Sequence, residues 1–188
     1  IFLFMKGGPS HIDTFDHKPK LQADDGKELP FDKPRVQFSD TGKLLKSPWK
    51  FKPYGKSGML VSELFPHVAE CVDDICFLHS VHGTNAAHGG ALLKLHTGSD
   101  NFVRPSMGAW INYGLGTENQ DMPSYMVIQD PRGAPVNGAH VWGNGYLPAA
   151  YQGTLLRSKG TPILNLALPR GVDRNRQRGE LDQLKWLN

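Results

Sequence analysis

The chain has 188 residues, a length at which a single domain buries enough surface to hold a core without disulfides or metals. Its 39% apolar and 10% aromatic residues argue against intrinsic disorder, while 21 Gly and 14 Pro predict many turns and long loops instead of a helical bundle. The net charge of +3 is too small to indicate a nucleic-acid-binding protein, and no apolar run reaches the roughly 20 residues that a membrane span needs.

Short apolar runs predict the strands. Residues 1–5 and residues 75–81 are nearly continuous apolar runs, and the first of them stops at a pair of glycines. Such runs are typical of buried central strands in a parallel sheet. Residues 124–129 predict a third strand, and residues 154–157 predict a short fourth one.

Helical spacing of apolar residues predicts the helices between and after these strands. The segments with this spacing are residues 61–73, 89–96, 107–113 and 174–187. Asp173 is placed to cap the last helix, and residues 10–58 predict mostly loop with one short helix. The alternation of strands and helices predicts an α/β fold with a doubly wound, mostly parallel sheet.

A polar segment follows the first predicted strand. After Gly7 and Gly8, which allow close backbone approach, come imidazole and carboxylate groups within seven residues: His11, Asp13, Asp16 and His17. Ligands collect at the carboxyl ends of strands in open α/β sheets, and this set of groups suits a divalent metal. The alternative is a polar turn in which Asp16 caps and the histidines face water.

A second polar segment follows the second predicted strand. It runs from His79 to Gly90 and holds His79, His82 and His88 with Thr84 and Asn85, directly before a predicted helix. A helix N-terminus offers unpaired N–H groups to a phosphate or sulfate oxygen. The alternative is that these histidines are ordinary hydrogen-bonding side chains.

Three other features have a functional and a structural interpretation. Residues 43–56 are rich in lysine, which suits either an anionic polymer or a solvated loop. Arg104 could hold an anion or be a surface arginine. Cys71 and Cys76 fit neither a CxxC nor a zinc pattern, and are expected to be buried free thiols.

Several blocks of the sequence resemble a known bacterial family. They are residues 1–16 (IFLFMKGGPSHIDTFD), 104–110 (RPSMGAW), 113–120 (YGLGTENQ), 147–153 (LPAAYQG) and 162–166 (PILNL). The chain resembles the domain-of-unknown-function family numbered fifteen hundred and one, a sulfatase-like family of the alkaline phosphatase and sulfatase superfamily. The resemblance covers essentially all 188 residues.

The resemblance implies an alkaline phosphatase-like α/β fold, of which residues 1–188 would be the N-terminal part of one domain, truncated at both ends. It also implies an exported protein, periplasmic or extracellular, because such proteins follow a twin-arginine signal. Longer members carry further Asp-His-His type motifs that resemble distal metal ligands. The chain is therefore expected to hold at most the first half of a metal site, and to be inactive by itself.

Residue roles also follow from the resemblance. In sulfatases the nucleophile stands ten residues before the glycine that closes a helix, and counting back from Gly98 reaches His88, not Cys or Ser. His88, with Thr84 or Asn85, would face the scissile group, and Arg104 would hold the anion. Asp13, with His11, would bind a divalent metal, zinc or calcium.

The implied function is metal-dependent hydrolysis of sulfate or phosphate esters, with a small-molecule or polysaccharide ester as substrate, no nucleic acid as partner and no membrane span. Because neither Cys nor Ser stands at position 88, a second reading remains. The protein would then be a non-catalytic binding or scaffold protein that keeps the fold.

Overall fold

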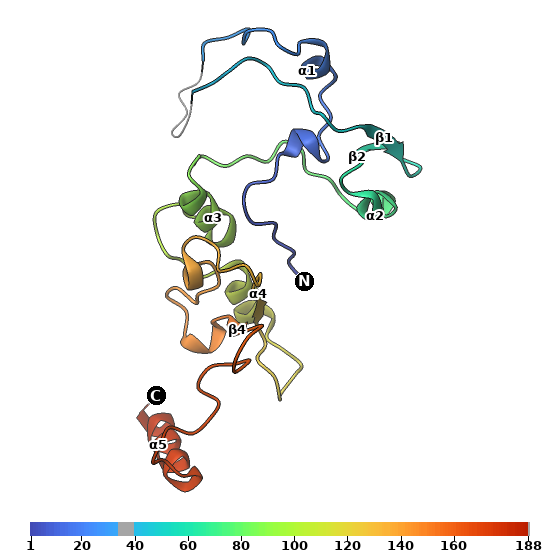
Figure 1. Ribbon diagram of the computed structural model, residues 1–188. Coiled ribbons are helices and arrows are strands. Elements are labelled where there is room, and N and C mark those ends of the chain that lie inside the picture. Colours follow the sequence, from blue (N-terminus) through green and yellow to red (C-terminus); the bar gives the residue numbers. More distant parts are fainter. Residues whose placement is uncertain (34–39, 188) are drawn as a thin grey trace. The chain divides into compact units, whose positions relative to one another are not determined.

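The computed structural model describes residues 1–33 and 40–187 (Figure 1). The chain divides into two compact units, Ile1–Leu95 and His96–Asn188. Each unit is a mixture of short helices and short strands joined by long loops, so the structure confirms a mixed α/β composition. None of the helices in the described residues is long and apolar enough to cross a membrane.

The first unit is built around a β-hairpin. The unit contains the 3₁₀ turn η1 (His11–Asp13), α1 (Pro19–Ala23), β1 (Phe51–Tyr54), β2 (Met59–Ser62), α2 (Pro66–Ala69) and η2 (Val72–Asp74). Strands β1 and β2 pair antiparallel, from Phe51 opposite Ser62 to Tyr54 opposite Met59. The carboxylate of Asp73 accepts hydrogen bonds from the N–H groups of Lys56 (2.8 Å) and Ser57 (3.2 Å), which fixes the hairpin turn.

A small hydrophobic core lies beneath this hairpin. Val61, Ala69 and Val72 are buried, and the partly buried side chains packed against them are Phe15, Tyr54, Met59, Phe65 and Phe77. The N–H of Ser62 donates to the carbonyl of Thr14 (2.9 Å), so the residues that follow η1 are attached to β2. This attachment holds the first polar segment against the core.

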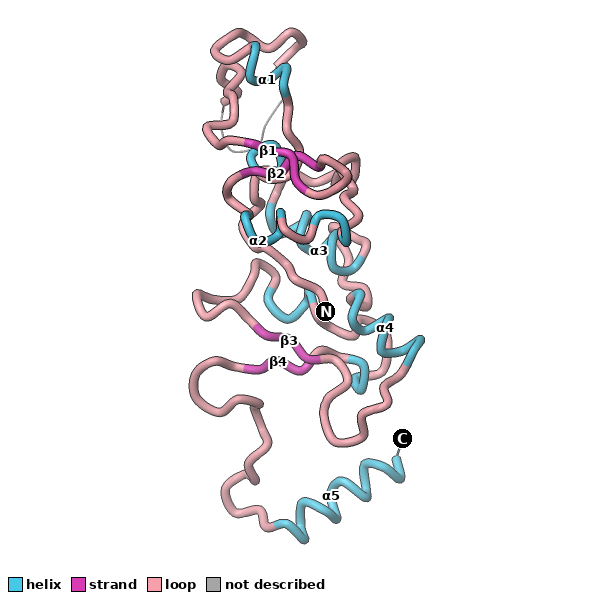
Figure 2. Tube along the Cα trace, turned by 90° about the vertical axis from the view of Figure 1, so that its right-hand side faces the viewer, coloured by secondary structure: helices cyan, strands magenta, loops and turns pink. Residues whose placement is uncertain are grey.

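The second unit centres on α4 and a parallel strand pair (Figure 2). Helix α3 (His88–Thr97) begins in the first unit and ends in the second, which then contains α4 (Met107–Leu115), β3 (Met126–Ile128), η3 (Gly138–Val141), η4 (Ala149–Tyr151), β4 (Thr154–Leu156) and α5 (Arg174–Leu187). Strands β3 and β4 pair parallel, with Met126 opposite Thr154. The close fit of this unit depends on glycine at two positions, because a Cβ at Gly108 would overlap the ring of Tyr125 and one at Gly145 would overlap the backbone of Arg104 and Pro105.

Several predicted elements are confirmed. Helices α3, α4 and α5 and strands β3 and β4 lie where the sequence predicts them. The predicted cap of α5 is also present, since the Asp173 carboxylate accepts a hydrogen bond from the N–H of Arg176 at 2.8 Å.

Two predicted strands are wrong. Residues 1–5 and 75–81 form no strand, and side chains such as Leu3 (87% exposed) and Val81 (75%) face outward. A central strand exists only where neighbouring strands satisfy its backbone groups, and within the described residues these two runs have no strand to pair with. The described strands form two separate two-stranded sheets, one antiparallel and one parallel, which accounts for the mixed composition.

Two further predictions fail at the hairpin. The expected helix over residues 61–73 is replaced by the end of β2, the single turn α2 and η2, because Val61 and Ser62 are paired with β1. Cys71 and Cys76 are free, as expected, but both are exposed instead of buried. The apolar residues between Val61 and Val72 do reach the core, but they do so from β2, α2 and η2 instead of from one helix.

Candidate functional site

The two predicted polar segments line one pocket in the first unit. The pocket has a volume of about 570 Å³, and its lining residues are His11, Thr14, Phe15, Asp16, Lys18, Phe77, Leu78, His79, Ser80, Val81 and His82. The segments come together although the two strands expected to place them are absent. Their contact rests on the attachment of Thr14 to β2 and on the packing of Phe15 and Phe77 against the core.

Asp16 is the electrostatic centre of the pocket. Its carboxylate lies 2.9 Å from Lys18 Nζ and 3.9 Å from His11 Nε2, and its side chain is only 14% exposed. The hydrogen bond from Lys18 lowers the pKa of Asp16 and outweighs the opposite effect of burial, and the charges of Lys18, His79 and His11 each add a smaller lowering effect. Asp16 is therefore an ionised carboxylate surrounded by groups that are or can become cationic.

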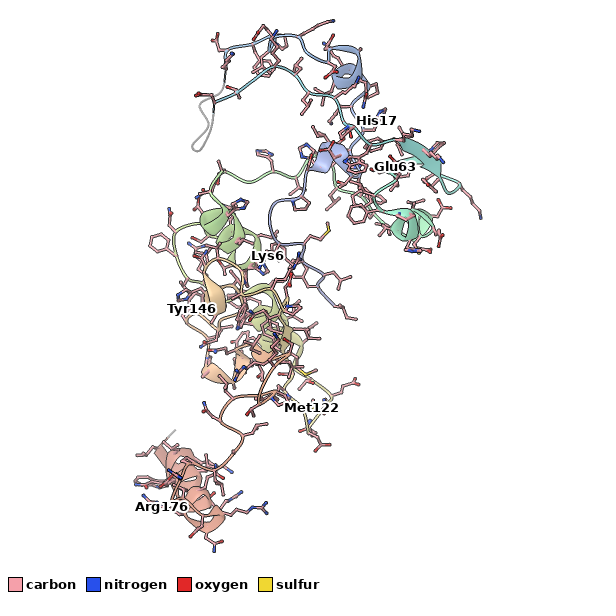
Figure 3. All side chains as sticks on the ribbon, in the orientation of Figure 1. Lys6, His17, Glu63, Met122, Tyr146 and Arg176 are labelled. Atoms are coloured by element: carbon pink, nitrogen blue, oxygen red, sulfur yellow. The ribbon has the colours of Figure 1, made fainter. Side chains whose placement is uncertain are left out.

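Aromatic rings form the apolar wall of the pocket. The ring of Phe77 lies 5.4 Å from that of Phe15 and 6.0 Å from that of His79, measured between centroids. Phe15 in turn contacts Phe65 at 4.9 Å, which connects the wall to the core. His17, predicted to belong to the same polar cluster, lies beside the pocket with its ring 4.7 Å from that of Phe51 (Figure 3).

The two candidate metal ligands lie on the same turn of the chain but in different surroundings. His11 lines the pocket, and Asp13, also in η1, does not. Hydrogen bonds from the side chains of Ser47 and Ser10 lower the pKa of Asp13, so this carboxylate is ionised. Among residues 1–33 and 40–187, no three His, Cys, Asp or Glu side chains come close enough to hold a metal ion, so these residues alone do not make a metal site.

His88 stands at the first residue of α3 and is exposed. Its ring lies against the glycine turn of the first polar segment, because a Cβ built at Gly8 would be 3.3 Å from His88 Cε1. Gly8 has a φ of +67°, so a side chain there would be strained as well as crowded. The close backbone approach expected of this glycine pair is thus present at Gly8, with His88 as its neighbour.

The other two candidate catalytic residues lie just before α3. The Asn85 carboxamide oxygen accepts a hydrogen bond from the N–H of Ala87 (2.9 Å), and its amide nitrogen packs so closely on Gly90 that a Cβ there would overlap it. Thr84 is exposed. Thr84, Asn85 and His88 do not line the pocket. Asn85 therefore has a structural role at the helix start.

Arg104 belongs to the second unit, where it is exposed. Its backbone is fixed by the buried residues Pro105 and Ser106 that follow it and by Gly145, which leaves no room for a Cβ beside Arg104 and Pro105. The guanidinium projects from a firmly held backbone.

Two lysines of the 43–56 stretch lie near carboxylates of the first unit. Lys46 is 3.3 Å from Asp25, and Lys43 is 3.9 Å from Glu28. The N–H of Lys46 also donates to the Asp25 carboxylate at 3.0 Å. These contacts favour the solvated-loop interpretation over a surface for an anionic polymer.

Sequence reasoning missed Lys18 and Phe77 as parts of the site. Lys18 follows Asp16 by two residues, and an alternation of opposite charges at the end of a polar segment is a usable signal for an ion pair. Phe77 stands two residues before His79 within an apolar run, which predicts that it lies inside a strand. The loss of the strand exposes it to the pocket.

Comparison with curated proteins and with solved structures finds no match to this chain. One family matches, and it does so over the whole length, residues 1–188. Its description is "Protein of unknown function (DUF1501)". The chain belongs to this family, as the conspicuous blocks of its sequence suggest.

Proposed function

We propose that the protein serves in the metal-dependent hydrolysis of sulfate or phosphate esters, on an alkaline phosphatase-like fold and in an exported location. In this proposal His88 acts at the scissile group and Thr84 contacts the ester. Arg104, in the second unit, is a candidate for binding an anion. His11 and Asp13 are the first ligands of a zinc or calcium ion. The substrate is a small-molecule or polysaccharide ester.

The approach of Gly8 to His88 is the observation that carries the proposal. It brings the glycine turn of the first polar segment to the start of α3, with only 3.3 Å between a Cβ built at Gly8 and His88 Cε1. The exposed imidazole is accessible to a substrate, and histidine is the side chain most often used for proton transfer near neutral pH. The N–H groups at the start of α3 suit an anionic oxygen beside it.

His11 and Asp13 meet only part of the requirements of a zinc or calcium site. His11 and Asp13 supply an imidazole and an ionised carboxylate, which zinc accepts, while calcium prefers oxygen ligands alone. These two residues are fewer than the three or four protein ligands that a zinc site has.

The test combines metal analysis with ester turnover. The purified full-length protein is expected to contain zinc or calcium and to hydrolyse 4-nitrophenyl sulfate or 4-nitrophenyl phosphate. His88→Ala should lower kcat by about 100-fold or more, because a positioned acid or base contributes on that order. His67→Ala, which removes an exposed histidine of α2 outside the pocket, is the matched control and should leave kcat unchanged.

A second candidate function is a non-catalytic binding or scaffold protein. The contacts of Asn85 with Ala87 and Gly90 favour this second function. They give one of the three candidate catalytic residues near the start of α3 a structural role instead of a catalytic one. Absence of metal and of turnover in the wild-type protein would support the scaffold and reject the hydrolase. A kcat for His88→Ala equal to that of His67→Ala would reject the role of His88.

A further inference from the structure

We propose that the pocket of the first unit binds small aromatic anions, of the class of an aromatic carboxylate, with the ring against Phe77 and the anionic group at Lys18 and His79. The proposal goes beyond ester hydrolysis because it depends on the lining of the pocket alone. Thr84 and His88, to which the proposed hydrolysis assigns roles, do not line it.

The size and the apolar part of the pocket suit an aromatic ring. A volume of about 570 Å³ lies within the range of small-molecule sites. The ring of Phe77 is tilted by 39° to that of Phe15 and by 33° to that of His79, with centroids 5.4 and 6.0 Å away. A ligand ring placed against Phe77, offset-stacked or edge-to-face, would take one of the arrangements that aromatic rings prefer.

The rim of the pocket leaves apolar surface uncovered. Leu78 is 73% exposed and Val81 is 75% exposed, although both line the pocket. An apolar ligand group between them and Phe77 would remove this surface from water, with a gain of roughly 25 cal/mol for each Å² covered. The rim therefore favours a ligand with a substantial apolar part over a bare inorganic anion.

The polar part of the pocket has an excess of hydrogen-bond donors. Lys18, His11, His79, His82 and Ser80 can all donate, and Asp16 is the single carboxylate among the lining residues. Asp16 is already paired with Lys18 at 2.9 Å and is only 14% exposed, whereas Lys18 is 49% exposed and has three donors. Lys18 therefore presents donors to a ligand while the Asp16 carboxylate is largely covered, which favours a ligand whose polar group is rich in acceptors, as a carboxylate is.

A set of three probes tests the ligand class on the wild-type protein. Benzoate has the ring and the charge, cyclohexanecarboxylate has the charge without the aromatic ring, and benzyl alcohol has the ring without the charge. Dissociation constants can be measured by ligand-observed and protein-observed NMR. Benzoate is expected to bind at least about threefold more tightly than cyclohexanecarboxylate, from the worth of an aromatic pair. It should bind about tenfold more tightly than benzyl alcohol, from the worth of a charge-assisted hydrogen bond.

Two variants with matched controls locate the binding. Phe77→Leu should weaken benzoate binding about threefold or more and Lys18→Gln about tenfold. Phe31→Leu and Lys20→Gln change an exposed phenylalanine and an exposed lysine that do not line the pocket, and both should bind like wild type. Circular dichroism of each variant verifies that it is folded.

The outcomes separate this proposal from the hydrolase. Benzoate binding that is weakened by these factors in folded Phe77→Leu and Lys18→Gln, and not in the controls, supports the pocket even if no ester is hydrolysed. Equal affinity for the three probes, or no saturable binding of benzoate to the wild-type protein, overturns it even if esters are hydrolysed. Equal effects of the pocket variants and their controls overturn it as well.

Discussion

At the scale of single residues, Ser106 connects several segments of the second unit by hydrogen bonds. It is 1% exposed, its hydroxyl accepts a hydrogen bond from the N–H of Ala109 as the N-cap of α4, and its own N–H donates to the carbonyl of Gly143 at 3.0 Å. Burial raises the pKa of the Tyr125 hydroxyl, and a hydrogen bond with Ser106 partly opposes this effect. Ser106, in the sequence block of residues 104–110, thus has a structural role.

We expect Ser106→Ala to lower the free energy of unfolding by about 1–2 kcal/mol, because the variant loses the cap of α4 and leaves the Tyr125 hydroxyl short of a partner. Denaturation by urea would measure the change. Ser124→Ala, at an exposed serine two residues before β3, is the control and should change the free energy by less than about 0.5 kcal/mol. Equal effects of the two substitutions would contradict the role of Ser106.

At the scale of elements, α5 depends on local interactions. None of its residues is buried, and apolar side chains such as Leu184 (55% exposed) and Trp186 (83%) are largely in contact with solvent. Its described support consists of the Asp173 cap and of ion pairs one turn apart, Arg176–Glu180 and Arg178–Asp182, each at 3.1 Å. A helix of 14 residues with such support is marginal in water.

We expect Asp173→Ala to unravel the first turn of α5, since a lost N-cap costs about 1 kcal/mol and little packing compensates for it. Hydrogen exchange of the α5 amides should accelerate about fivefold, while exchange in α4 stays the same. Asp182→Ala is the matched control, because it removes a carboxylate from an exposed pair worth only a few tenths of a kcal/mol. Unchanged exchange in Asp173→Ala would show that α5 is held by other contacts.

Elements with local signals are the ones that the sequence predicts well. Helices α3, α4 and α5 each have their own periodicity or cap, and Asp173 is recognisable as a cap from its place before residue 174. Strands need partner strands that are distant in sequence, so residues 1–5 and 75–81 resemble strands by composition and yet are not strands in the described structure. The hairpin β1–β2 is missed because Pro53 and the three neighbouring lysines, Lys50, Lys52 and Lys56, obscure its pattern.

The candidate site is predicted in a similar way. The two polar segments are recognised by their ionisable groups, and the structure brings them to one pocket. The pairing of Asp16 with Lys18 and the wall formed by Phe15 and Phe77 depend on packing around the hairpin core. These contacts form only when segments that are distant in the sequence pack together, so the pattern of residues along the chain does not predict them.

At the scale of the whole molecule, carboxylates connect segments that are distant in the chain. Asp25 accepts a hydrogen bond from Lys46 N–H, Asp73 from Lys56 and Ser57 N–H, and Asp13 interacts with Ser47. In each case hydrogen bonding lowers the pKa of the carboxyl below its ordinary value. Their ionised forms therefore favour the folded state.

The sign of the resulting pH dependence follows from linkage. A carboxyl whose pKa is lower in the folded state gives its full stabilisation above the unfolded pKa of about 4 and loses it as the pH falls through the folded pKa. We expect the contribution of these carboxyls to the free energy of unfolding to be nearly constant from pH 7 to 5. Below pH 4 this contribution should fall steadily, and the free energy of unfolding with it. Urea denaturation across this range measures it.

The Asp73→Asn variant should show a shallower fall below pH 4 and a lower stability at pH 7, because it weakens the bonds that fix the hairpin turn. Asp74→Asn, which neutralises the next residue without touching that turn, is the matched control. The contribution of Asp73 would be refuted by equal acid profiles for the two variants.

The parallel pairing of β3 with β4 has a consequence for the order of folding. Parallel strands cannot be joined by a tight turn, and here residues 129–153 separate them, with only the 3₁₀ turns η3 and η4 between. Closing such a connection costs entropy before any strand hydrogen bond compensates for it, whereas α4 and its Ser106 cap form from neighbouring residues. We therefore expect α4 to be an early event of refolding and the β3–β4 pair to be a late one.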